Sequence, residues 1–457
     1  MAAESLFEGF EEHRRDSPDA PAILDFEGGQ AFSRDGLLTL ADELAPALRR
    51  AASASGVVAV QIPNGPELVA AVLCAWREGL VPLLIDRDRS VDEIDTLARA
   101  LGTSIVLRGE ALGIHWVEHV GEAVALSRDT AVLKLTSGST GEPRAVAVGA
   151  SALRVGIEQI CSTMGIGPAD RNLVTLPLAH SYAFDNVIGT LVVHGTPLVL
   201  VSDLVPRHLF AVLRETGVTV WPTVPLLLDV MARSGAAGEA PLGSLRSVIS
   251  AGAPLPAATR ERFAQRFHLR PRTFYGATEC GGISFDREGT GDLPDGCVGH
   301  PMDGVSIALV DAEDGVGRIR VESASVASGT YPEATPGLGE RTLLTSDLGR
   351  VDPQGRLHLL GRVGEFVKIH GHKVYPVEVE RVIRGIDGVW DVTVVPHARS
   401  DVSEGLRAVI AADPGVDRAA IVRGCEERLS SHKVPRSIEI RRELPRNERG
   451  KLDRLRL

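Results

Sequence analysis

The sequence has few cysteines, few aromatic residues and no long uninterrupted apolar run. Its five cysteines are scattered over 457 residues, with no CxxC pair and no Cys/His spacing typical of a metal site. The pattern therefore argues against a disulfide framework and against a zinc-binding module. No stretch approaches the roughly 20 apolar residues that a membrane-spanning helix needs. The first residues lack the basic start and apolar core of a signal peptide, so we expect a cytoplasmic protein.

The balance of charge excludes a further class. A net charge of −11 argues against a nucleic-acid-binding protein. The charge is uneven, because the segment from residue 365 onward has a slight excess of Lys and Arg. Two readings of this excess stay open: a solvated basic tail, or a domain that meets phosphates or an acidic partner.

Length and apolar patterning predict the fold class. A chain of 457 residues is long for a single core, so we expect at least two domains. Short β-branched runs alternate with helical patterns in the first half, which is typical of an α/β fold with parallel strands and crossover helices. The expected strands are 57–62, 104–107, 198–201 and 218–220, and the expected helices include 37–50 and 66–76.

The texture changes after residue 304. Alternating strands at 305–310, 317–321 and 356–360, separated by Gly and Asp turns, predict a small antiparallel sheet or barrel. A compact mixed segment follows, which ends in a helix at 418–430 and a basic tail. We predict a domain junction at Gly364, dividing the chain into domains 1–363 and 364–457. A glycine there can absorb a hinge motion, although an ordinary turn glycine fits the sequence equally well.

Residues 136–144 (TSGSTGEPR) form the most informative segment, directly behind the apolar run 131–135. Glycines allow a tight backbone with N–H groups turned toward an anion, hydroxyls add donors, and Arg144 adds a fixed charge suited to phosphate. The spacing excludes a Walker A loop, which ends in Gly-Lys-Ser/Thr. The predicted phosphate-binding residues are Thr136, Ser137, Gly138, Ser139, Thr140, Gly141 and Arg144.

Six further motifs follow this loop along the chain. They are residues 176–182 (LPLAHSY), 251–255 (AGAPL), 275–279 (YGATE), 345–350 with 361–362 (TSDLGR and GR), 368–378 (KIHGHKVYPVE) and 450–454 (GKLDR). In this order and over about residues 15–457, the seven motifs resemble the adenylate-forming superfamily. That superfamily includes acyl-CoA synthetases, luciferases and the adenylation domains of peptide synthetases, and the pattern is most similar to aryl- or acyl-CoA ligases.

The resemblance implies a fold and a reaction. The fold is α/β, with a large N-terminal domain of α/β subdomains and a small β-barrel-like subdomain, followed by a small mobile α+β C-terminal domain. The reaction is ATP-dependent activation of a carboxylic acid as an acyl-adenylate with release of pyrophosphate, and then formation of a thioester with CoA. The cofactors implied are ATP, Mg²⁺ and CoA, or the phosphopantetheine of a carrier protein.

The resemblance also assigns nucleotide-binding and catalytic roles. Glu279 binds Mg²⁺, Thr278 contacts the α-phosphate, and Lys451 bridges the acid and ATP in the transition state. Such positive charge is needed because a carboxylate attacks an anionic phosphate. The residues assigned to the adenine and the ribose are Gly252, Ala253, Pro254, Tyr275, Gly276, Asp347 and Arg362.

The acid pocket is assigned in the same way, to His180, Ser181, Tyr182, Gly276 and Gly281. His180 either contacts or gates the carboxylate, or is a packed core residue. Amino-acid-activating relatives have an Asp where this chain has Ser181, so we expect an acid without an α-amino group. Asp185 is the alternative ammonium ligand, and the aromatic-containing run 182–184 resembles ligases of aryl acids.

The thiol step is assigned to the small domain, where Lys368 and Gly371 replace Lys451 after rotation at Gly364. A glycine at 371 leaves room for a pantetheine arm, which favours a thioester product. The alternative acceptor is a carrier protein, and a third hypothesis is a non-catalytic nucleotide-binding module. The sequence departs from the family pattern at Arg144, where Lys is usual, and at Ala145 and Ser346, where Gly is usual.

Overall fold

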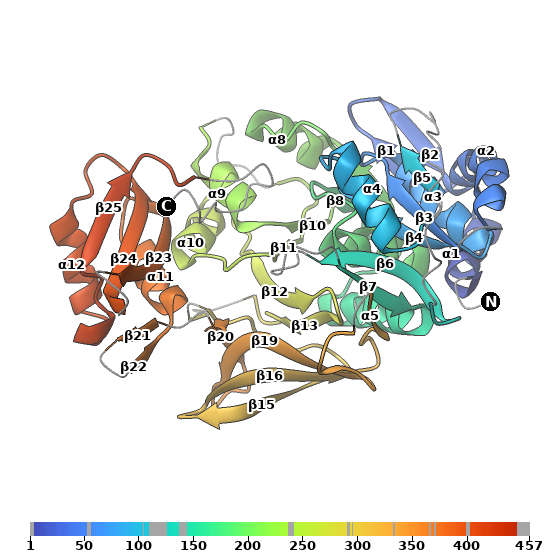
Figure 1. Cartoon of the computed structure of the whole chain (residues 1–457). Helices are drawn as coiled ribbons and strands as arrows, with labels where there is room; N and C mark the ends of the chain where they lie inside the picture. The colour runs from blue at the N-terminus through green and yellow to red at the C-terminus, as the bar shows by residue number, and fades with distance from the viewer. Residues whose placement is uncertain are drawn as a thin grey trace.

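The computed structural model has two α/β sheets side by side, a small antiparallel sheet below them and a small C-terminal domain at one end (Figure 1). It describes residues 4–52, 56–103, 105–108, 126–136, 144–235, 242–289, 293–294, 296–331, 334–364, 367–369, 372–398 and 403–445. Within these ranges, no helix has the length and hydropathy required to cross a membrane.

The first α/β sheet has six strands in the order β17-β7-β6-β4-β3-β5. Its strands are β3 (Val57–Gln61), β4 (Val81–Leu84), β5 (Ile105–Arg108), β6 (Thr130–Thr136), β7 (Arg144–Gly149) and β17 (Gly329–Tyr331). Strands β3, β4, β5 and β6 pair in parallel, whereas β6 and β7 form an antiparallel hairpin. The helices between or beside them are α2 (Arg34–Ala52), α3 (Pro66–Arg77) and α4 (Val91–Ala100).

The second sheet has nine strands in the order β14-β13-β12-β11-β10-β8-β9-β1-β2. Its strands are β1 (Pro21–Asp25), β2 (Gln30–Ser33), β8 (Asn172–Val174), β9 (Leu198–Leu200), β10 (Val220–Thr223), β11 (Ser247–Ser250), β12 (Arg272–Ala277), β13 (Gly281–Phe285) and β14 (His300–Pro301). The helical elements of this part are α1 (Glu4–Asp16), α5 (Ala150–Met164), α6 (Ser181–Ala183), the π-helical turn η1 (Phe184–Ile188), α7 (Gly189–His194), α8 (Pro206–Glu215), α9 (Pro225–Arg233) and α10 (Ala257–Phe267).

The largest apolar core lies between the two sheets. It combines residues of α3, α5 and η1 with one face of the nine-stranded sheet, where Val220, Ile249 and Phe274 are buried. The opposite face, with Trp221 and Val248, packs on α8, α9 and α10. The segment α6–η1 is thus sandwiched between the sheets, which places the predicted acid pocket at their junction.

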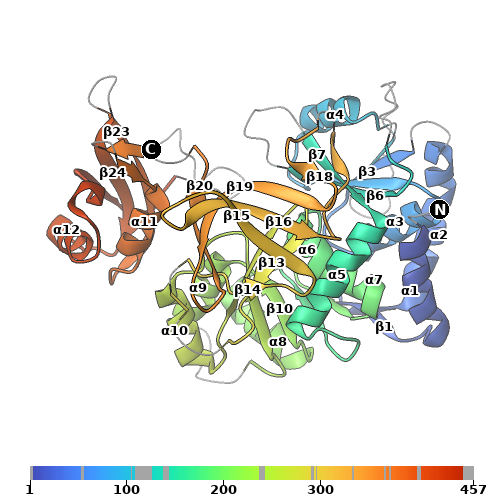
Figure 2. The ribbon, with the colours of Figure 1, turned by 90° about the horizontal axis from the view of Figure 1, so that it is seen from below.

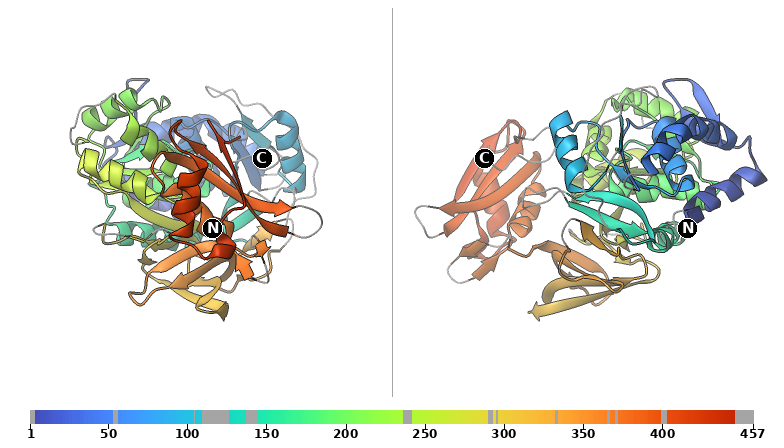
Figure 3. Two further views of the ribbon diagram at one scale, coloured as in Figure 1. Left: turned by 90° about the vertical axis from the view of Figure 1, so that its left-hand side faces the viewer. Right: turned by 45° about the vertical axis from the view of Figure 1, so that its right-hand side comes forward.

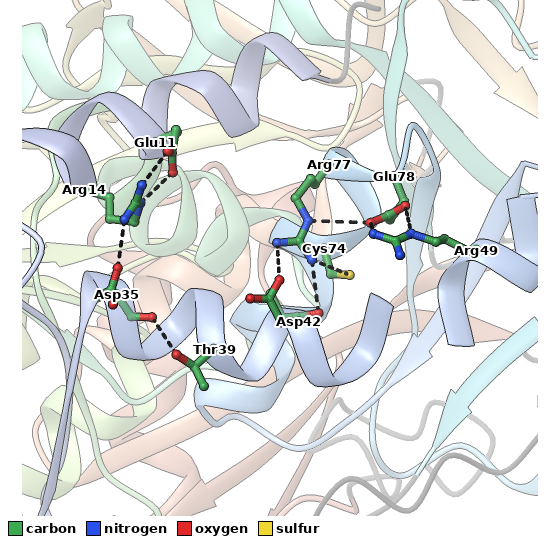
Figure 4. A network of polar contacts seen from close by, with 10 residues as sticks. Glu11, Arg14, Asp35, Thr39, Asp42, Arg49, Cys74, Arg77 and Glu78 are labelled. Atoms are coloured by element: carbon green, nitrogen blue, oxygen red, sulfur yellow. Dashed lines mark hydrogen bonds and ion pairs between the residues drawn. The ribbon is translucent and has the colours of Figure 1, made fainter. Parts of the chain in front are cut away.

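Ion pairs join the three N-terminal helices at the surface (Figure 4). Arg14 of α1 contacts Asp35 of α2 at 2.8 Å, and Arg77 of α3 contacts Asp42 of α2 at 2.7 Å. Arg49 adds a contact of 2.8 Å to Glu78 just after α3. Exposed pairs of this kind contribute little individually, so apolar packing holds these helices in place.

The small antiparallel sheet covers the lower side of the large ones in Figure 1, and it lies in front of them in the view from below (Figure 2). It comprises β15 (Val305–Glu313), β16 (Val316–Ser323), β18 (Leu338–Gly339), β19 (Thr342–Val351) and β20 (Leu357–Arg362), in the order β15-β16-β19-β18 with β20 paired to β19. This confirms the small antiparallel sheet expected after residue 304. Strands β19 and β20 carry the predicted ribose-binding residues Asp347 and Arg362 opposite each other.

The C-terminal domain is a separate α+β unit that projects from one end of the molecule (Figure 3). It contains β21 (Val367–Ile369), β22 (His372–Val374), α11 (Pro376–Arg384), β23 (Val389–Ala398), β24 (Ser403–Ala412), α12 (Arg418–Glu426), the 3₁₀ turn η2 (Ser431–Lys433) and β25 (Ser437–Arg441). Its own apolar core includes Val379, Ile383 and Leu406. The predicted fold class, a large α/β domain followed by a small α+β domain, is confirmed.

Three local predictions need correction. The helix expected at 418–430 ends at Glu426, and the stretch expected to be a simple basic tail contains β25, which pairs in parallel with β24. The sequence of β25, SIEIR, is short and has two charged residues among five, and its order comes from pairing with the buried strand β24. The strand expected at 218–220 lies at Val220–Thr223, because the N–H groups of residues 219 and 220 both bond to the Arg171 carbonyl.

Candidate active site

The β12–β13 hairpin carries Thr278 and Glu279 in its turn. Ala277 pairs with Gly281 across the hairpin. A Cβ on Gly276 would lie 2.5 Å from the Gly281 carbonyl oxygen, so only glycine allows the strands to approach this closely. Gly281 itself has φ +70°, a conformation that favours glycine. The two glycines of the predicted pocket therefore shape the turn that presents Thr278 and Glu279.

Tyr275, Asp347 and Arg362 form one hydrogen-bonded set. The Tyr275 hydroxyl donates to Asp347 Oδ2 at 2.6 Å, and Arg362 Nε donates to Asp347 Oδ1 at 2.9 Å. Burial, followed by the nearby Asp347 charge, raises the pKa of Tyr275, so its hydroxyl stays protonated and can donate. Three residues predicted for adenine and ribose thus meet although they come from three strands.

The predicted acid-pocket segment touches this hairpin. Ser181 Oγ lies 3.1 Å from Thr278 Oγ1, and the Tyr182 ring lies against Phe274 with a centroid distance of 5.5 Å. The Tyr182 hydroxyl donates to the Ile249 carbonyl at 2.9 Å, which fixes the ring beside β11. The structure therefore brings Ser181 and Tyr182, predicted for the acid pocket, next to the hairpin that carries Thr278, predicted for the α-phosphate.

Asn64 and Gln61 hold the neighbouring loops, and neither was predicted. Asn64 Nδ2 donates to the Leu176 carbonyl, and Asn64 Oδ1 accepts from the Leu178 N–H, both at 2.8 Å. Gln61 Nε2 donates to three carbonyls of the turn 86–89, at 3.2 Å to Asp86 and at 2.9 Å to Arg87 and Arg89. These amides lock the backbone before His180 and around Asp86.

His180 lies at the edge of the site. Its Nε2 is 3.5 Å from Asp86 Oδ1, and its side chain is 59% exposed. Of the two interpretations of His180, the packed core residue is therefore wrong. An exposed imidazole beside a carboxylate suits a residue that meets a substrate or gates its entry.

Lys134 and Asp185 form a buried ion pair that sequence reasoning did not identify. Lys134 Nζ lies 2.5 Å from Asp185 Oδ1, and the side chains are 3% and 8% exposed. Lys134 also lies 5.4 Å from the centroid of the Phe184 ring. Burial raises the pKa of Asp185, while Lys134 opposes that rise. A lysine inside the apolar run 131–135 was the available signal, since a buried lysine requires a partner.

Glu279 has the surroundings expected of a magnesium ligand. Burial has the largest effect and raises the pKa of Glu279. The nearby Asp347 charge raises it further, whereas Arg362 lowers it. A partly buried carboxylate beside a second carboxylate has an uncompensated negative charge, which a divalent cation can neutralise. Among the described residues, no three His, Cys, Asp or Glu side chains gather as a protein metal cage. A single carboxylate is nevertheless the donor set that Mg²⁺ uses when phosphates complete its shell.

The ends of the phosphate loop lie next to each other. Thr136 pairs with Arg144 across the β6–β7 hairpin, and Thr136 Oγ1 lies 3.4 Å from the Arg144 carbonyl oxygen. Gly252, with φ +80°, Ala253 and Pro254 form an exposed turn directly after β11. The predictions for Ser137, Gly138, Ser139, Thr140 and Gly141 fall outside the described residues.

The hinge and thiol-step residues are described only in part. Gly364 follows β20 with φ +84°, and a Cβ placed there would meet no atom within 4 Å in the described structure. Lys368 belongs to the β21–β22 hairpin, paired with Lys373. Gly371 and Lys451 lie outside the described residues. The functional roles of all four stay predictions.

The chain is similar to known proteins over most of its length. A family model described as AMP-binding enzyme matches residues 10–331, and the AMP-binding enzyme C-terminal domain matches residues 378–451. A 3,4-dihydroxybenzoate–[aryl-carrier protein] ligase of Bacillus anthracis is 26% identical over 376 residues, covering 81% of this chain and 83% of that protein. A feruloyl-CoA synthase of an Amycolatopsis species is 27% identical over an alignment of 479 residues, covering 96% of this chain and 95% of that protein.

A solved structure shares the whole fold. The crystal structure of ATP-bound MatB from Rhodopseudomonas palustris superposes with a TM-score of 0.84 at 23% identity, covering 99% of this chain and 97% of MatB. At that identity the likeness supports the architecture alone. It agrees with the layered arrangement of the two large sheets, the small sheet and the C-terminal domain.

Proposed function

Because the chain belongs to the AMP-binding enzyme family, and is thus an AMP-forming acid–thiol ligase, we propose that its substrate is an aryl acid without an α-amino group and its acceptor is CoA. Binding of ATP and formation of an acyl-adenylate are the activities of this family. The proposal covers the identity of the acid and of the acceptor, the binding of Mg²⁺ and the roles of single residues. It also includes a cytoplasmic location.

The Lys134–Asp185 ion pair is the main reason to propose that the substrate is not an amino acid. Asp185 is the acidic side chain that could have held a substrate ammonium, but its Oδ1 is already bound by Lys134 at 2.5 Å. An ammonium brought to this neutral pair would meet the like charge of Lys134. Ser181, at the position where amino-acid-activating relatives have an Asp, supplies only a hydroxyl and faces Thr278.

Aromatic residues support the choice of an aryl acid. The rings of Tyr182 and Phe274 lie 5.5 Å apart with an interplanar angle of 31°. The Tyr182 hydroxyl is engaged by the Ile249 carbonyl, so this side chain offers its ring to a neighbour. Two relatives bear the names of aryl acid ligases, one for 3,4-dihydroxybenzoate and one for feruloyl-CoA.

The residues divide the chemistry between them. Asp347, oriented by Tyr275 and Arg362, accepts from the ribose hydroxyls. Thr278 contacts the α-phosphate. Glu279 would hold Mg²⁺, which supplies charge neutralisation for the phosphates when bound.

Two basic residues complete the site. Arg144, at the exit of the phosphate loop, binds phosphate oxygens with bidentate geometry. Lys451, brought in from the C-terminal domain, stabilises the charge that develops as the carboxylate attacks the α-phosphorus.

The thiol acceptor is assigned to CoA through the predicted role of Gly371. Loading of a carrier protein is the second candidate, and the Bacillus anthracis relative named for an aryl-carrier protein favours it. Exposed Arg436 and Arg442 in the small domain suit either acceptor, since CoA phosphates and acidic carriers are both anionic.

The first test is acid-dependent ATP–pyrophosphate exchange without any thiol. The full chain is assayed with ATP, Mg²⁺ and a panel of aryl, fatty, short-chain and amino acids. Exchange confined to aryl acids is the expected result. Exchange with amino acids overturns the assignment of Asp185 and Ser181, and silence with every acid while ATP still binds favours the non-catalytic hypothesis.

The second test compares acceptors with the best acid from the panel. CoA and a phosphopantetheinylated carrier protein are supplied separately, and the thioester is detected by mass spectrometry. A faster reaction with CoA at equal concentration is expected. A reaction with the carrier alone replaces CoA by the carrier and leaves the adenylation step as proposed.

A further inference from the structure

Residues 323–328, named the connector, link the small sheet to the first α/β sheet. Ser323 is the last residue of β16, and Gly329 begins β17, which pairs with β7. Between these strands the connector bonds to the turn of the β12–β13 hairpin. Its hydroxyls at Ser323 and Ser325 are buried, with exposed fractions of 3% and 4%. Buried hydroxyls require partners, so their hydrogen bonds show what the connector holds.

The connector holds two consecutive carbonyls in the turn that carries Glu279. Ser325 Oγ donates to the Cys280 carbonyl at 2.8 Å, and the Ala327 N–H donates to the Glu279 carbonyl, also at 2.8 Å. These bonds fix the peptide planes on both sides of Cys280, and one of the planes begins at the Cα of Glu279. The connector therefore limits where the Glu279 carboxylate lies.

The other end of the connector is attached to β7. The Ser328 N–H and the Ser328 Oγ both donate to the Ala147 carbonyl, at 3.1 Å and 3.0 Å. Strand β7 begins at Arg144, the exit of the phosphate loop. The connector is thus a short covalent link between the turn with the proposed metal ligand and the hairpin with the proposed phosphate ligands.

A directed chain of hydrogen bonds supports Ser325. A carbonyl only accepts, so the single hydroxyl proton of Ser325 goes to Cys280. The contact of 2.8 Å between the Ser323 and Ser325 hydroxyls must then be donated by Ser323. Ser323 in turn accepts from Gln159 Nε2 at 3.1 Å. Each bond polarises the next, so the chain from Gln159 to the Cys280 carbonyl is stronger than its separate parts.

Helix α5 supports this chain from the side of the small sheet (Figure 2). It provides Gln159, which is 8% exposed and bonds to the end of β16. It also approaches Ser325 closely, since a Cβ on Gly156 would lie 3.2 Å from the Ser325 Cβ. The Ser325 side chain is therefore held between α5 and the hairpin turn.

We propose that Ser325 is a positioning residue for Glu279: through the Cys280 carbonyl it holds the Glu279 carboxylate where this group meets a divalent cation on the ATP phosphates. The inference rests on the proposed function, since Glu279 is the proposed Mg²⁺ ligand. Ser325 acts through the turn and not by contact with the nucleotide. Removing a group that orients a metal ligand typically lowers metal affinity by about 10- to 100-fold.

The test measures the Kd for ATP by calorimetric titration of the full chain, once with Mg²⁺ and once with EDTA. The ratio of the two Kd values, named the magnesium factor, is the extent to which the cation strengthens ATP binding, and it requires no turnover. In Ser325→Ala the magnesium factor should be about 10-fold smaller than in the wild type, because the carboxylate is no longer held in place. The Kd in EDTA should stay within about 2-fold, since a group behind a metal ligand acts through the metal.

Ser328→Ala is the matched control. It removes a hydroxyl from the same connector, but the Ala147 carbonyl keeps its bond from the Ser328 N–H, so the connector stays attached to β7. Its magnesium factor should equal that of the wild type. If the connector were merely structural, Ser325→Ala would have a lower Tm and an unchanged magnesium factor, which would overturn the inference.

Ser323→Ala removes the middle of the chain and leaves the bond from Ser325 to Cys280 in place. Its magnesium factor should fall by about 3-fold, because Ser325 loses the donor that polarises it. This variant decides the question if Ser325→Ala does not fold: a wild-type magnesium factor in Ser323→Ala then overturns the inference.

Glu279→Gln, titrated in the same way, separates the inference from the function on which it rests. A magnesium factor that is lost in Glu279→Gln but unchanged in folded Ser325→Ala overturns the positioning role and leaves Glu279 as the metal ligand. A wild-type magnesium factor in Glu279→Gln removes the proposed metal ligand and the inference with it. Equal losses in Ser325→Ala and Ser328→Ala overturn the specific role of Ser325, since they indicate general loosening of the connector.

Discussion

The Tyr275 hydroxyl donates a hydrogen bond of 2.6 Å to Asp347 Oδ2, between residues 72 positions apart in the sequence. It links the strand β12 of the nine-stranded sheet to the strand β19 of the small sheet. Since Arg362 bonds to the other carboxylate oxygen, Asp347 has one fixed orientation. The proposed ribose ligand is therefore oriented before the nucleotide arrives, which lowers the entropy cost of binding.

Tyr275→Phe should weaken nucleotide binding and spare the chemical step. The variant keeps the ring but loses the donor that orients Asp347, so KM for ATP should rise about 5-fold while kcat changes less than about 2-fold. Steady-state exchange kinetics with varied ATP measure both constants. An unchanged KM for ATP would show that the hydroxyl does not orient Asp347 for binding.

Tyr182→Phe is the matched control, because it also removes a buried hydroxyl that donates to one acceptor, the Ile249 carbonyl. Tyr182 belongs to the proposed acid pocket, so this change should raise KM for the acid and leave KM for ATP in place. Equal effects of both variants on both substrates would contradict the assignment of the two tyrosines to separate subsites.

Glu279→Gln should raise the stability of the folded protein at neutral pH and lower its activity. Burial raises the pKa of the folded-state carboxyl above its ordinary value of 4.5. A raised pKa means that ionising Glu279 destabilises the fold, so its contribution is favourable below pH 4.5 and is lost as pH rises through the folded-state pKa. At neutral pH the glutamine variant should therefore have the higher Tm, and the difference should vanish at low pH.

The same variant should lose the proposed metal ligand. Exchange should fall by at least about 100-fold, since charge neutralisation of the phosphates is the largest electrostatic demand of the reaction. Wild-type activity should decline on the acid side at a pH above 4.5, as Glu279 becomes protonated. A pH–rate profile measures the effect on activity, and thermal scans from pH 4 to 8 measure the effect on stability. A lower Tm for Glu279→Gln than for the wild type at pH 8 would show that the Glu279 carboxylate does not destabilise the fold.

Lys134→Met should destabilise the fold strongly, and a second change should rescue it. Removing one partner of a buried pair leaves an uncompensated charge and costs about 3–5 kcal/mol, whereas removing both is nearly neutral. The double variant Lys134→Met/Asp185→Leu, in which both partners become apolar, should therefore lie within about 1 kcal/mol of the wild type. Urea unfolding measures the free energies. Additive losses in the double variant would mean that the two side chains are not coupled.

Much of the site was predictable because chemistry dictates residue type and order. The motifs at 275–279, 345–350 and 176–182 predicted that Tyr275, Asp347, Ser181 and Thr278 serve one site, and the structure brings them together. Glycine patterns also had a local cause, as the close approach of Gly276 to Gly281 shows.

Other features depend on contacts that spacing does not encode. The partner of Lys134 lies 51 residues away in η1, and which carboxylate it meets depends on how β6 packs against that turn. Among the described residues Asn186 Oδ1 has no hydrogen-bond partner, and spacing does not reveal this, because it depends on Nδ2 donating to the Tyr182 carbonyl. Strand β25 was missed for a similar reason, since tertiary pairing outweighs weak local propensity.

Lys451→Ala should abolish adenylation and spare ATP binding. The family resemblance implies that Lys451 acts in the transition state, where the carboxylate meets the α-phosphorus, and not in the ground-state nucleotide complex. Exchange should fall by about 100-fold or more while the Kd for ATP stays within about 2-fold. Calorimetric titration and exchange assays measure the two quantities. Unchanged turnover would remove the assigned role.

Gly364→Pro should separate the two half-reactions. Proline holds φ near −65°, which excludes the φ of +84° at this position. If residue 364 is the hinge between domains 1–363 and 364–457, the half-reaction that uses the present arrangement should be lost, and the other should persist. ATP–pyrophosphate exchange reports the first half-reaction, and single-turnover transfer from preformed acyl-adenylate to CoA reports the second.

The pair Gly364→Ala and Gly355→Ala controls for strain alone. Gly355 has φ +81° in the turn between β19 and β20, and a Cβ there would have His300 as its nearest neighbour, at 3.9 Å. Both alanines should therefore lower stability by about 1–2 kcal/mol through backbone strain. Only Gly364→Ala should change the ratio of the two half-reaction rates, because only that position is proposed to change conformation between them. Equal ratios in both variants would place the hinge elsewhere in the chain.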